Sequence, residues 1–106
     1  MYRGYSKYRA KPCVIDGIRF ASQKEGRRYK ELRLLEKAEK ISELRLQVKY
    51  PMWVNFNHIC NYIGDFEYED EIGAIITEDT KGVRTPIYRL KRKLFKALYG
   101  KDIVET

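Results

Sequence analysis

Residues that bind zinc, form disulfide frameworks or cross membranes are scarce in this sequence of 106 residues. It has two cysteines, Cys13 and Cys60, no CxxC pair and a single histidine, His58. This usage argues against a zinc site and favours reduced thiols in a cytosol over a disulfide framework. No apolar run approaches the roughly 20 residues that span a bilayer, and residues 1–12 lack the apolar segment of a secretory signal. We therefore expect a cytoplasmic protein.

Acidic residues are too few to balance the basic ones. The chain carries 22 Lys and Arg against 15 Asp and Glu, and its formal net charge is +7. Such an excess indicates a polyanionic partner, and nucleic acid is the commonest one. With 43% hydrophobic and 35% charged residues, the composition is that of a folded protein, and the length suits one domain.

The first twelve residues contain no acidic side chain. Tyrosines alternate there with the basic residues, a combination suited to phosphate contact and base stacking. We expect residues 1–12 to form a flexible arm that contacts DNA, with a simple frayed terminus as the alternative, and residues 13–106 to form the domain. The basic residues of this arm are Arg3, Lys7, Arg9 and Lys11.

A hairpin and a helix are predicted to open the domain. Two short apolar pieces flank Asp16-Gly17, a strong signal for a tight turn. Ser22 and Glu25 then have the spacing of a capping box, which predicts a helix from residue 22 to about residue 40. Glu25 lies one turn before Tyr29 on the inward side of this helix. It either only closes the capping box or reaches a site at the helix start.

Residues 44–81 have the patterns of strands. Alternation over 44–48 predicts a strand that ends at Pro51, and 52–56 continue as a second strand or an extended edge. After a turn near 55–58, strands over 59–68 and 75–81 form a hairpin through the turn at 70–73. Antiparallel neighbours in this hairpin can bring Asp65 and Asp79 together. By strand periodicity, Asp79 and Lys81 share one face, while Glu78 and Thr80 point to the other.

A second helix is predicted from the N-cap Thr85 and Pro86 to Gly100, and 103–104 can supply a short last strand. Its expected buried stripe is Ile87, Leu90, Leu94 and Leu98. A basic stripe on the opposite face suggests either DNA contact or an ordinary solvated surface, and it contains Arg89, Arg92, Lys93 and Lys96. Lys91 falls at the edge of the buried side, where it points toward the Asp79 strand or extends past apolar neighbours to solvent.

Four residues from separate elements are thus expected to converge: Glu25, Asp65, Asp79 and Lys81. Two carboxylates and a backbone carbonyl make an oxygen-rich site suited to Mg²⁺ or Mn²⁺. A lysine beside them can orient an attacking water and stabilise charge on a phosphate. This combination suits a metal-dependent phosphodiesterase.

The order and spacing of these residues resemble the PD-(D/E)xK nuclease superfamily. Residues 16–104 more closely resemble small phage-encoded endonucleases related to Holliday junction resolvases. The stretches that carry the resemblance are SQKE (22–25), YIGDF (62–66), DTK (79–81) and, around them, LRLQVKY (44–50) and YRLKRKLFKALYG (88–100). Gly64 departs from the pattern, because it stands where the superfamily name has Pro. The resemblance implies an α/β fold with an αβββαβ core, a mixed sheet flanked by helices, preceded here by a short hairpin.

The resemblance also implies roles. Asp65, Asp79 and the Thr80 carbonyl would bind Mg²⁺ or Mn²⁺, Glu25 would complete a second metal site or orient a water, and Lys81 would assist catalysis. A Gln is expected at Gln47, for support of the site or DNA contact, although an ordinary outward polar residue would look the same. The expected substrate is branched DNA, cut by a homodimer during phage recombination or packaging in the bacterial cytoplasm. The rival hypothesis is a non-catalytic DNA-binding or structural protein with the nuclease fold.

Overall fold

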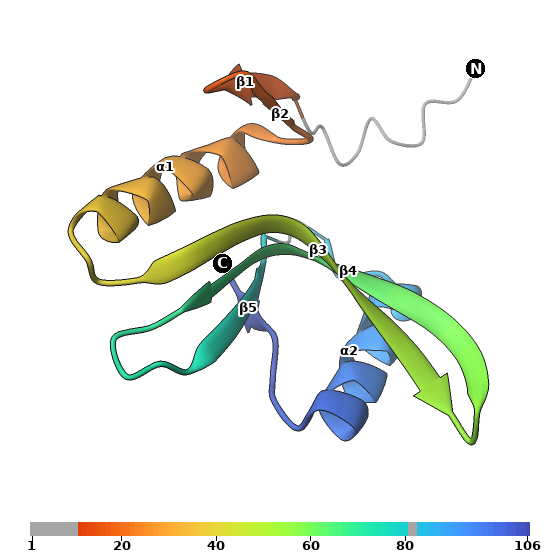
Figure 1. Ribbon diagram of the computed structural model, residues 1–106. Helices are drawn as coiled ribbons and strands as arrows, with labels where there is room; N and C mark the ends of the chain where they lie inside the picture. The colour runs from red at the N-terminus through yellow and green to blue at the C-terminus, as the bar shows by residue number, and fades with distance from the viewer. Residues whose placement is uncertain (1–10, 81–82) are drawn as a thin grey trace, which may run out of the picture.

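The computed structural model describes residues 11–80 and 83–106, which form an α/β fold (Figure 1). Eight elements follow one another in the predicted order of hairpin, helix, three strands, helix and strand. They are β1 (Cys13–Ile15), β2 (Ile18–Phe20), α1 (Gln23–Lys37), β3 (Ser42–Val54), β4 (Asn57–Glu69), β5 (Ile75–Asp79), α2 (Pro86–Tyr99) and β6 (Val104–Glu105).

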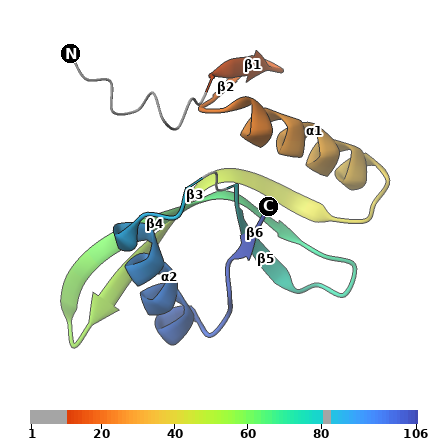
Figure 2. The same cartoon turned by 180° about the vertical axis from the view of Figure 1, so that it is seen from behind.

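The main sheet has four strands in the order β3-β4-β5-β6. The first three are antiparallel neighbours, whereas β6 runs parallel to β5, so the sheet is mixed. Helix α1 lies over one face of the sheet and α2 over the other, displaced along the long strands β3 and β4 (Figures 1 and 2). The predicted α/β class with a mixed sheet flanked by two helices is therefore confirmed.

The start of α1 is fixed by local sequence, as predicted. The Ser22 side chain accepts a hydrogen bond of 3.1 Å from the Glu25 backbone N–H, which caps the helix. The β1–β2 hairpin packs directly against this first turn at Gly26. A Cβ at Gly26 would lie 2.6 Å from the Cys13 sulfur and 2.8 Å from Ile15 Cδ1, so only glycine allows this approach. The helix ends at Lys37, three residues before the predicted end.

One long strand replaces the two predicted pieces on either side of Pro51. β3 runs unbroken from Ser42 to Val54, with Pro51 opposite Asn61 in the ladder. The prediction that Pro51 ends a strand was wrong because β3 is an edge strand, where the missing N–H of proline can face away from the ladder.

The buried side chains form two clusters. The α1 cluster consists of Phe20, Tyr29, Leu32, Ile41, Phe66 and Tyr68. The α2 cluster consists of Tyr50, Met52, Tyr62, Tyr88, Phe95 and Ile103. Leu46 packs on the α1 cluster and Val48 on the α2 cluster, although residues two apart share a face in a regular strand. The residue between them, Gln47, has a φ of +52°, and β3 changes face at this point.

Helix α2 begins and ends as predicted but buries a different face. Thr85 caps it by accepting a 3.1 Å hydrogen bond from the Tyr88 N–H, and Gly100 closes it with a φ of +72°. The buried residues are Tyr88 and Phe95, with Leu94 partly buried. Of the predicted aliphatic stripe, Ile87 is 68% exposed, Leu90 67% and Leu98 42%. That part of the prediction was wrong.

Most of the predicted basic arm, including Arg3, Lys7 and Arg9, lies outside the described residues, and Lys11 is exposed. Within residues 11–80 and 83–106, no helix has the length and apolar character needed to cross a membrane.

Candidate functional site

Two predicted site carboxylates, Asp65 and Asp79, lie opposite each other on neighbouring strands. β4 and β5 pair antiparallel with Phe66 opposite Glu78, and one step further this register places Asp65 across from Asp79. The turn between the strands forms as predicted, since the Asp70 side chain accepts hydrogen bonds from the backbone N–H groups of Ile72 and Ala74. The hairpin that the sequence predicted thus brings the two carboxyl groups close enough to interact.

Gln47 joins Glu25 to this pair. Its Nε2 donates to Glu25 Oε2 at 3.1 Å and to Asp65 Oδ1 at 3.3 Å, so one amide group links α1, β3 and β4. Gln47 is exposed to solvent, yet it is not the ordinary outward polar residue that its strand position allowed. Its left-handed backbone is an uncommon conformation for a residue other than glycine, and such strain is typical of functional sites.

Hydrogen bonds from both sides orient the two aspartates. The Tyr62 hydroxyl donates to Asp79 Oδ2 at 2.5 Å, and the Thr80 backbone N–H donates to Asp65 Oδ2 at 2.8 Å. Burial, followed by the contact with Asp79, raises the pKa of Asp65 to about 7 against the lowering effect of the Thr80 N–H. Burial and the Asp79 carboxylate also raise the pKa of Tyr62. Negative charge is therefore concentrated here in a poorly solvated place.

The oxygen donors at the site suit a hard divalent cation, but only a few of them lie together. Among residues 11–80 and 83–106, no group of three or more His, Cys, Asp and Glu side chains is arranged to hold a metal ion. Asp65 and Asp79 supply two carboxylates, and the Thr80 carbonyl is a third oxygen next to them in the chain. Glu25 is connected to this pair through Gln47, so its role as a further ligand stays a prediction. Lys81 lies outside the described residues.

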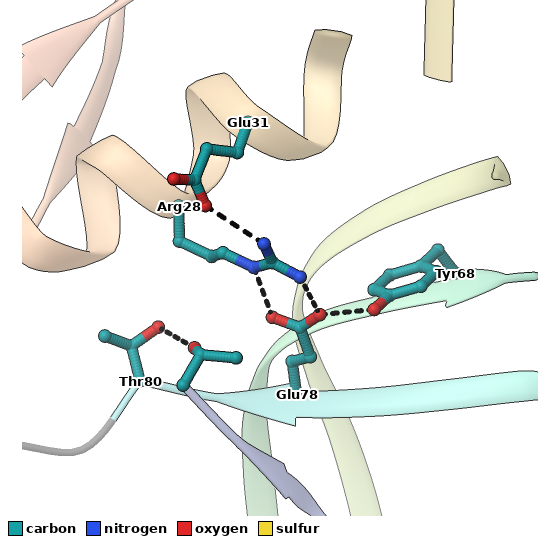
Figure 3. A network of polar contacts seen from close by, with 6 residues as sticks. Arg28, Glu31, Tyr68, Glu78 and Thr80 are labelled. Atoms are coloured by element: carbon teal, nitrogen blue, oxygen red, sulfur yellow. Dashed lines mark hydrogen bonds and ion pairs between the residues drawn. The ribbon is translucent and has the colours of Figure 1, made fainter. Parts of the chain in front are cut away.

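A second network occupies the other face of β5, as strand periodicity predicted for Glu78 (Figure 3). The fully buried Glu78 carboxylate accepts from Arg28 Nε at 2.9 Å and Nη2 at 2.7 Å, and from the Tyr68 hydroxyl. Arg28 also contacts Glu31 at 3.0 Å. The Glu78 hydrogen bond raises the pKa of Arg28, and burial followed by that carboxylate raises the pKa of Tyr68 to about 12. This network ties α1 to the sheet and so positions Glu25.

Gly64, the departure from the PD-(D/E)xK pattern, has a packing reason. A Cβ on Gly64 would lie 3.0 Å from Thr77 Cγ2 and 3.4 Å from the Tyr50 ring. The Tyr50 hydroxyl is itself bonded to Thr77 at 2.8 Å and to Glu67 at 2.5 Å. The position beside Asp65 is therefore filled by neighbouring side chains, and a larger residue would displace them.

Basic side chains border the site on the α1 side. A cavity of about 240 Å³ is lined by Lys24, Arg27, Arg28, Glu31, Thr80 and Thr106. The hydroxyl groups of Thr80 and Thr106 are 3.1 Å apart there. Lys24 and Arg27 were not predicted as nucleic-acid contacts, although they directly precede and follow Glu25-Gly26 in the helix. Arg28 is paired with Glu78 and Glu31, so Lys24 and Arg27 are the residues that would add positive potential at this edge of the site.

The basic residues of α2 are only partly available. Arg92 pairs with Glu105 at 3.0 Å and Lys96 with Asp102 at 3.3 Å. Arg89 and Lys93 are exposed, and Lys91 is half-buried. DNA contact by this helix stays a prediction for all five.

The sequence interpretation missed Tyr62 and Arg28. In a regular strand Tyr62, three residues before Asp65, would point to the opposite face, yet its hydroxyl reaches Asp79. Arg28 carried a usable signal, because it lies one turn after the predicted site residue Glu25 on the same helix.

Comparison with known proteins supplies one match. No curated protein and no solved structure matches the chain significantly. A family model described as "Protein of unknown function (DUF1064)" matches residues 5–105, which include every described element and all the site carboxylates. The chain belongs to the DUF1064 family.

Proposed function

We propose that this protein is a Mg²⁺- or Mn²⁺-dependent DNA endonuclease of the PD-(D/E)xK type. The observation that carries the proposal is the contact between Asp65 and Asp79, linked to Glu25 by the Gln47 amide. Three carboxylates drawn from α1, β4 and β5 gather at one place, and carboxylates that close together disfavour one another's ionisation unless a cation binds. Binding a divalent cation next to a phosphate would account for this clustering.

The chain's own residues would act as follows. Asp65, Asp79 and the Thr80 carbonyl would hold the cation, while the Tyr62 hydroxyl and the Thr80 N–H keep the two carboxylates in place. When bound, the cation would polarise the phosphoryl oxygen and favour ionisation of the attacking water. Glu25 would orient that water, and Gln47 would hold Glu25 toward it. Lys81, two residues after Asp79, would stabilise the charge that develops on the phosphate.

DNA as the substrate is supported by the net charge of +7 and by the cations around the cavity beside Thr80. That cavity borders the site on the α1 side, where a neighbouring phosphate of the same strand would lie. Branched DNA, and a role in phage recombination or packaging, rest on the resemblance to resolvase-related endonucleases. Symmetric cutting of a branch needs two sites, so we propose a homodimer, with the exposed side chains of Ile87 and Leu90 as part of the contact.

Cleavage of labelled DNA tests the proposal. Four-way junction, linear duplex and single strand are incubated with the protein in Mg²⁺, Mn²⁺ or EDTA. We expect metal-dependent cutting that Asp79→Asn abolishes without weakening DNA binding, because a negative charge facing phosphate is removed. Asp102→Asn makes the same change at an exposed position and should cut like the wild type.

The outcomes separate the hypotheses. Paired nicks confined to the junction support a resolvase, and cutting of all substrates supports a nuclease of broader specificity. Binding without cutting in both metals favours the non-catalytic DNA-binding protein. Wild-type cutting by Asp79→Asn contradicts the assigned site.

A further inference from the structure

The tip of the β3–β4 hairpin carries an aromatic residue, Phe56, at a turn position whose backbone conformation favours glycine. The strands are joined by the two-residue turn Asn55-Phe56, whose φ values are +48° and +64°. Two positive φ values define the type I′ turn, in which Asn-Gly is strongly preferred because glycine has no side chain to strain. Phe56 occupies the glycine position, and its side chain is 99% exposed.

Nothing within the described fold benefits from this side chain. An exposed phenylalanine buries no apolar surface, and its backbone conformation is unfavourable. Three more apolar residues surround it at the tip: Trp53 is 55% exposed, Ile59 55% and Val54 38%. The Trp53 ring packs against His58 across the strands, with ring centroids 5.2 Å apart. The hairpin extends well beyond α2, away from the main body (Figures 1 and 2). The patch is therefore presented to a partner.

The chemistry of the hairpin indicates what that partner is. Residues 44–64 contain no Asp or Glu, although the whole chain has 15, and they include Arg45 and Lys49. The tip combines aromatic rings with the amide side chains of Asn55 and Asn57. Rings that stack, amides that hydrogen-bond and an absence of negative charge suit nucleic-acid bases next to phosphates.

We propose that the β3–β4 hairpin is a wedge that stacks Phe56, supported by Trp53, on unstacked bases of DNA. This inference rests on the proposed function only in taking DNA as the partner. Phe56 is nine residues from Asp65 along β4, a reach of at most about 30 Å at 3.3 Å per residue. A base stacked on Phe56 therefore lies at most about nine nucleotides, at 3.4 Å each, from the phosphate bound at Asp65 and Asp79. A base that is already unpaired, at a branch, gap or single-stranded end, is the easiest to stack on.

The chain offers an internal probe, because Trp53 is its only tryptophan. Intrinsic fluorescence is titrated with a fully paired duplex and with the same duplex carrying a gap or a four-way branch, in EDTA so that no cutting occurs. Base stacking at the tip should quench Trp53 and favour the gapped or branched DNA. The test variant is Phe56→Gly, which converts the turn to Asn-Gly and preserves the hairpin. Ile72→Gly changes an exposed apolar residue in the other hairpin turn and serves as the control.

We expect Phe56→Gly to lose about tenfold in affinity for gapped or branched DNA, the size of one base–aromatic stack, and little for duplex. Ile72→Gly should bind like the wild type. If Phe56→Gly binds gapped or branched DNA as tightly as the wild type, the wedge is overturned. It is also overturned if Trp53 fluorescence is quenched by raising the protein concentration alone, because the tip then contacts a second copy of the chain. A wild type that cuts while its Trp53 does not respond overturns the wedge but leaves the nuclease standing. Stacking without any cutting leaves the wedge standing and removes the nuclease.

Discussion

Glu78 and Asp79 are consecutive in β5, yet their carboxylates belong to separate networks on opposite faces of the strand. Glu78 is bound by Arg28 and Tyr68 under α1. Asp79 accepts from Tyr62 of the α2 cluster and contacts Asp65. Arg28 supplies the counter-charge of Glu78, and Asp79 lies next to the carboxyl group of Asp65. Glu78 is therefore expected to serve stability and Asp79 chemistry.

Removing the arginine of the structural network should destabilise the protein. Arg28→Ala leaves Glu78 fully buried without its ion pair, which costs about 3 kcal/mol in the free energy of unfolding. Glu31→Ala removes only the exposed partner of Arg28 and should cost under about 1 kcal/mol. Urea denaturation of both variants measures the difference, and equal losses would contradict the assignment of Glu78 to stability.

The buried aspartate pair predicts an unusual pH dependence of stability. The pKa of Asp65 is about 7 in the folded state, against an ordinary value of 3.8, so the folded protein binds this proton more tightly. The free energy of unfolding should therefore fall as the pH rises from about 4 to 7. Thermal melts in EDTA at pH 5 and pH 8 test this.

Two controls accompany those melts. Asp65→Asn removes the titrating group and should flatten this part of the pH profile. Mg²⁺ should raise the Tm of the wild type more at pH 8 than at pH 5, because a cation competes with the proton. An identical Mg²⁺ effect at both pH values would count against a metal site at Asp65.

Gln47 should support catalysis without contributing to DNA affinity. Gln47→Ala deletes the amide that links Glu25 to Asp65, and loss of such support typically costs 10–100-fold in activity. Comparison of the cleavage rate with DNA binding in EDTA separates the two roles. A variant that binds DNA much more weakly, yet cuts normally at saturation, would identify Gln47 as a DNA contact instead.

The exposed stripe of α2 should govern association rather than folding. Leu90→Lys is expected to leave the monomer as stable as the wild type and to abolish the proposed dimer, because it places charge in an apolar contact. Phe95→Ala, on the buried face of the same helix, should cost about 3–5 kcal/mol in unfolding free energy. Sedimentation with and without DNA reads out association. A wild type that stays monomeric at micromolar concentration would refute the dimer.

Phe56→Gly should make the protein more stable. The substitution relieves a left-handed backbone at Phe56 and completes an Asn-Gly turn, for a gain of about 1 kcal/mol. Chemical denaturation measures the gain. A loss of stability would mean that Phe56 packs within the fold, contrary to its exposure.

Local signals in the sequence predicted most of the architecture. Ser22, Thr85 and Gly100 define helix ends through hydrogen bonds to near neighbours, and Pro86 favours the start of α2 through its fixed φ. The hairpin turns at Asp16-Gly17 and at residues 70–73 are equally local. These signals do not depend on how the rest of the chain packs, which explains why the element order is confirmed.

Features that depend on packing were not predictable in the same way. The stripe of Ile87, Leu90, Leu94 and Leu98 has ideal helical spacing, but Tyr88 and Phe95 are the residues buried on the sheet. The Tyr88 hydroxyl also bonds Glu105 at 2.6 Å. The aromatic spacing of 88, 95 and 99 was the signal that could have found this face. No local signal indicates the positive φ of Gln47 or the contact of Tyr62 with Asp79. The change of face in β3 and the role of Tyr62 were therefore not predictable.

The edges of the sheet restrict how two copies can meet. At one edge, β3 contains Pro51, which lacks a backbone donor, and the charged side chains of Arg45 and Lys49. At the other edge, β6 is only two residues long. Neither edge offers a template on which a second chain could continue the ladder, which also protects the monomer from edge-to-edge aggregation. A dimer of this chain is therefore expected to be held by side chains, with two complete and separate sheets.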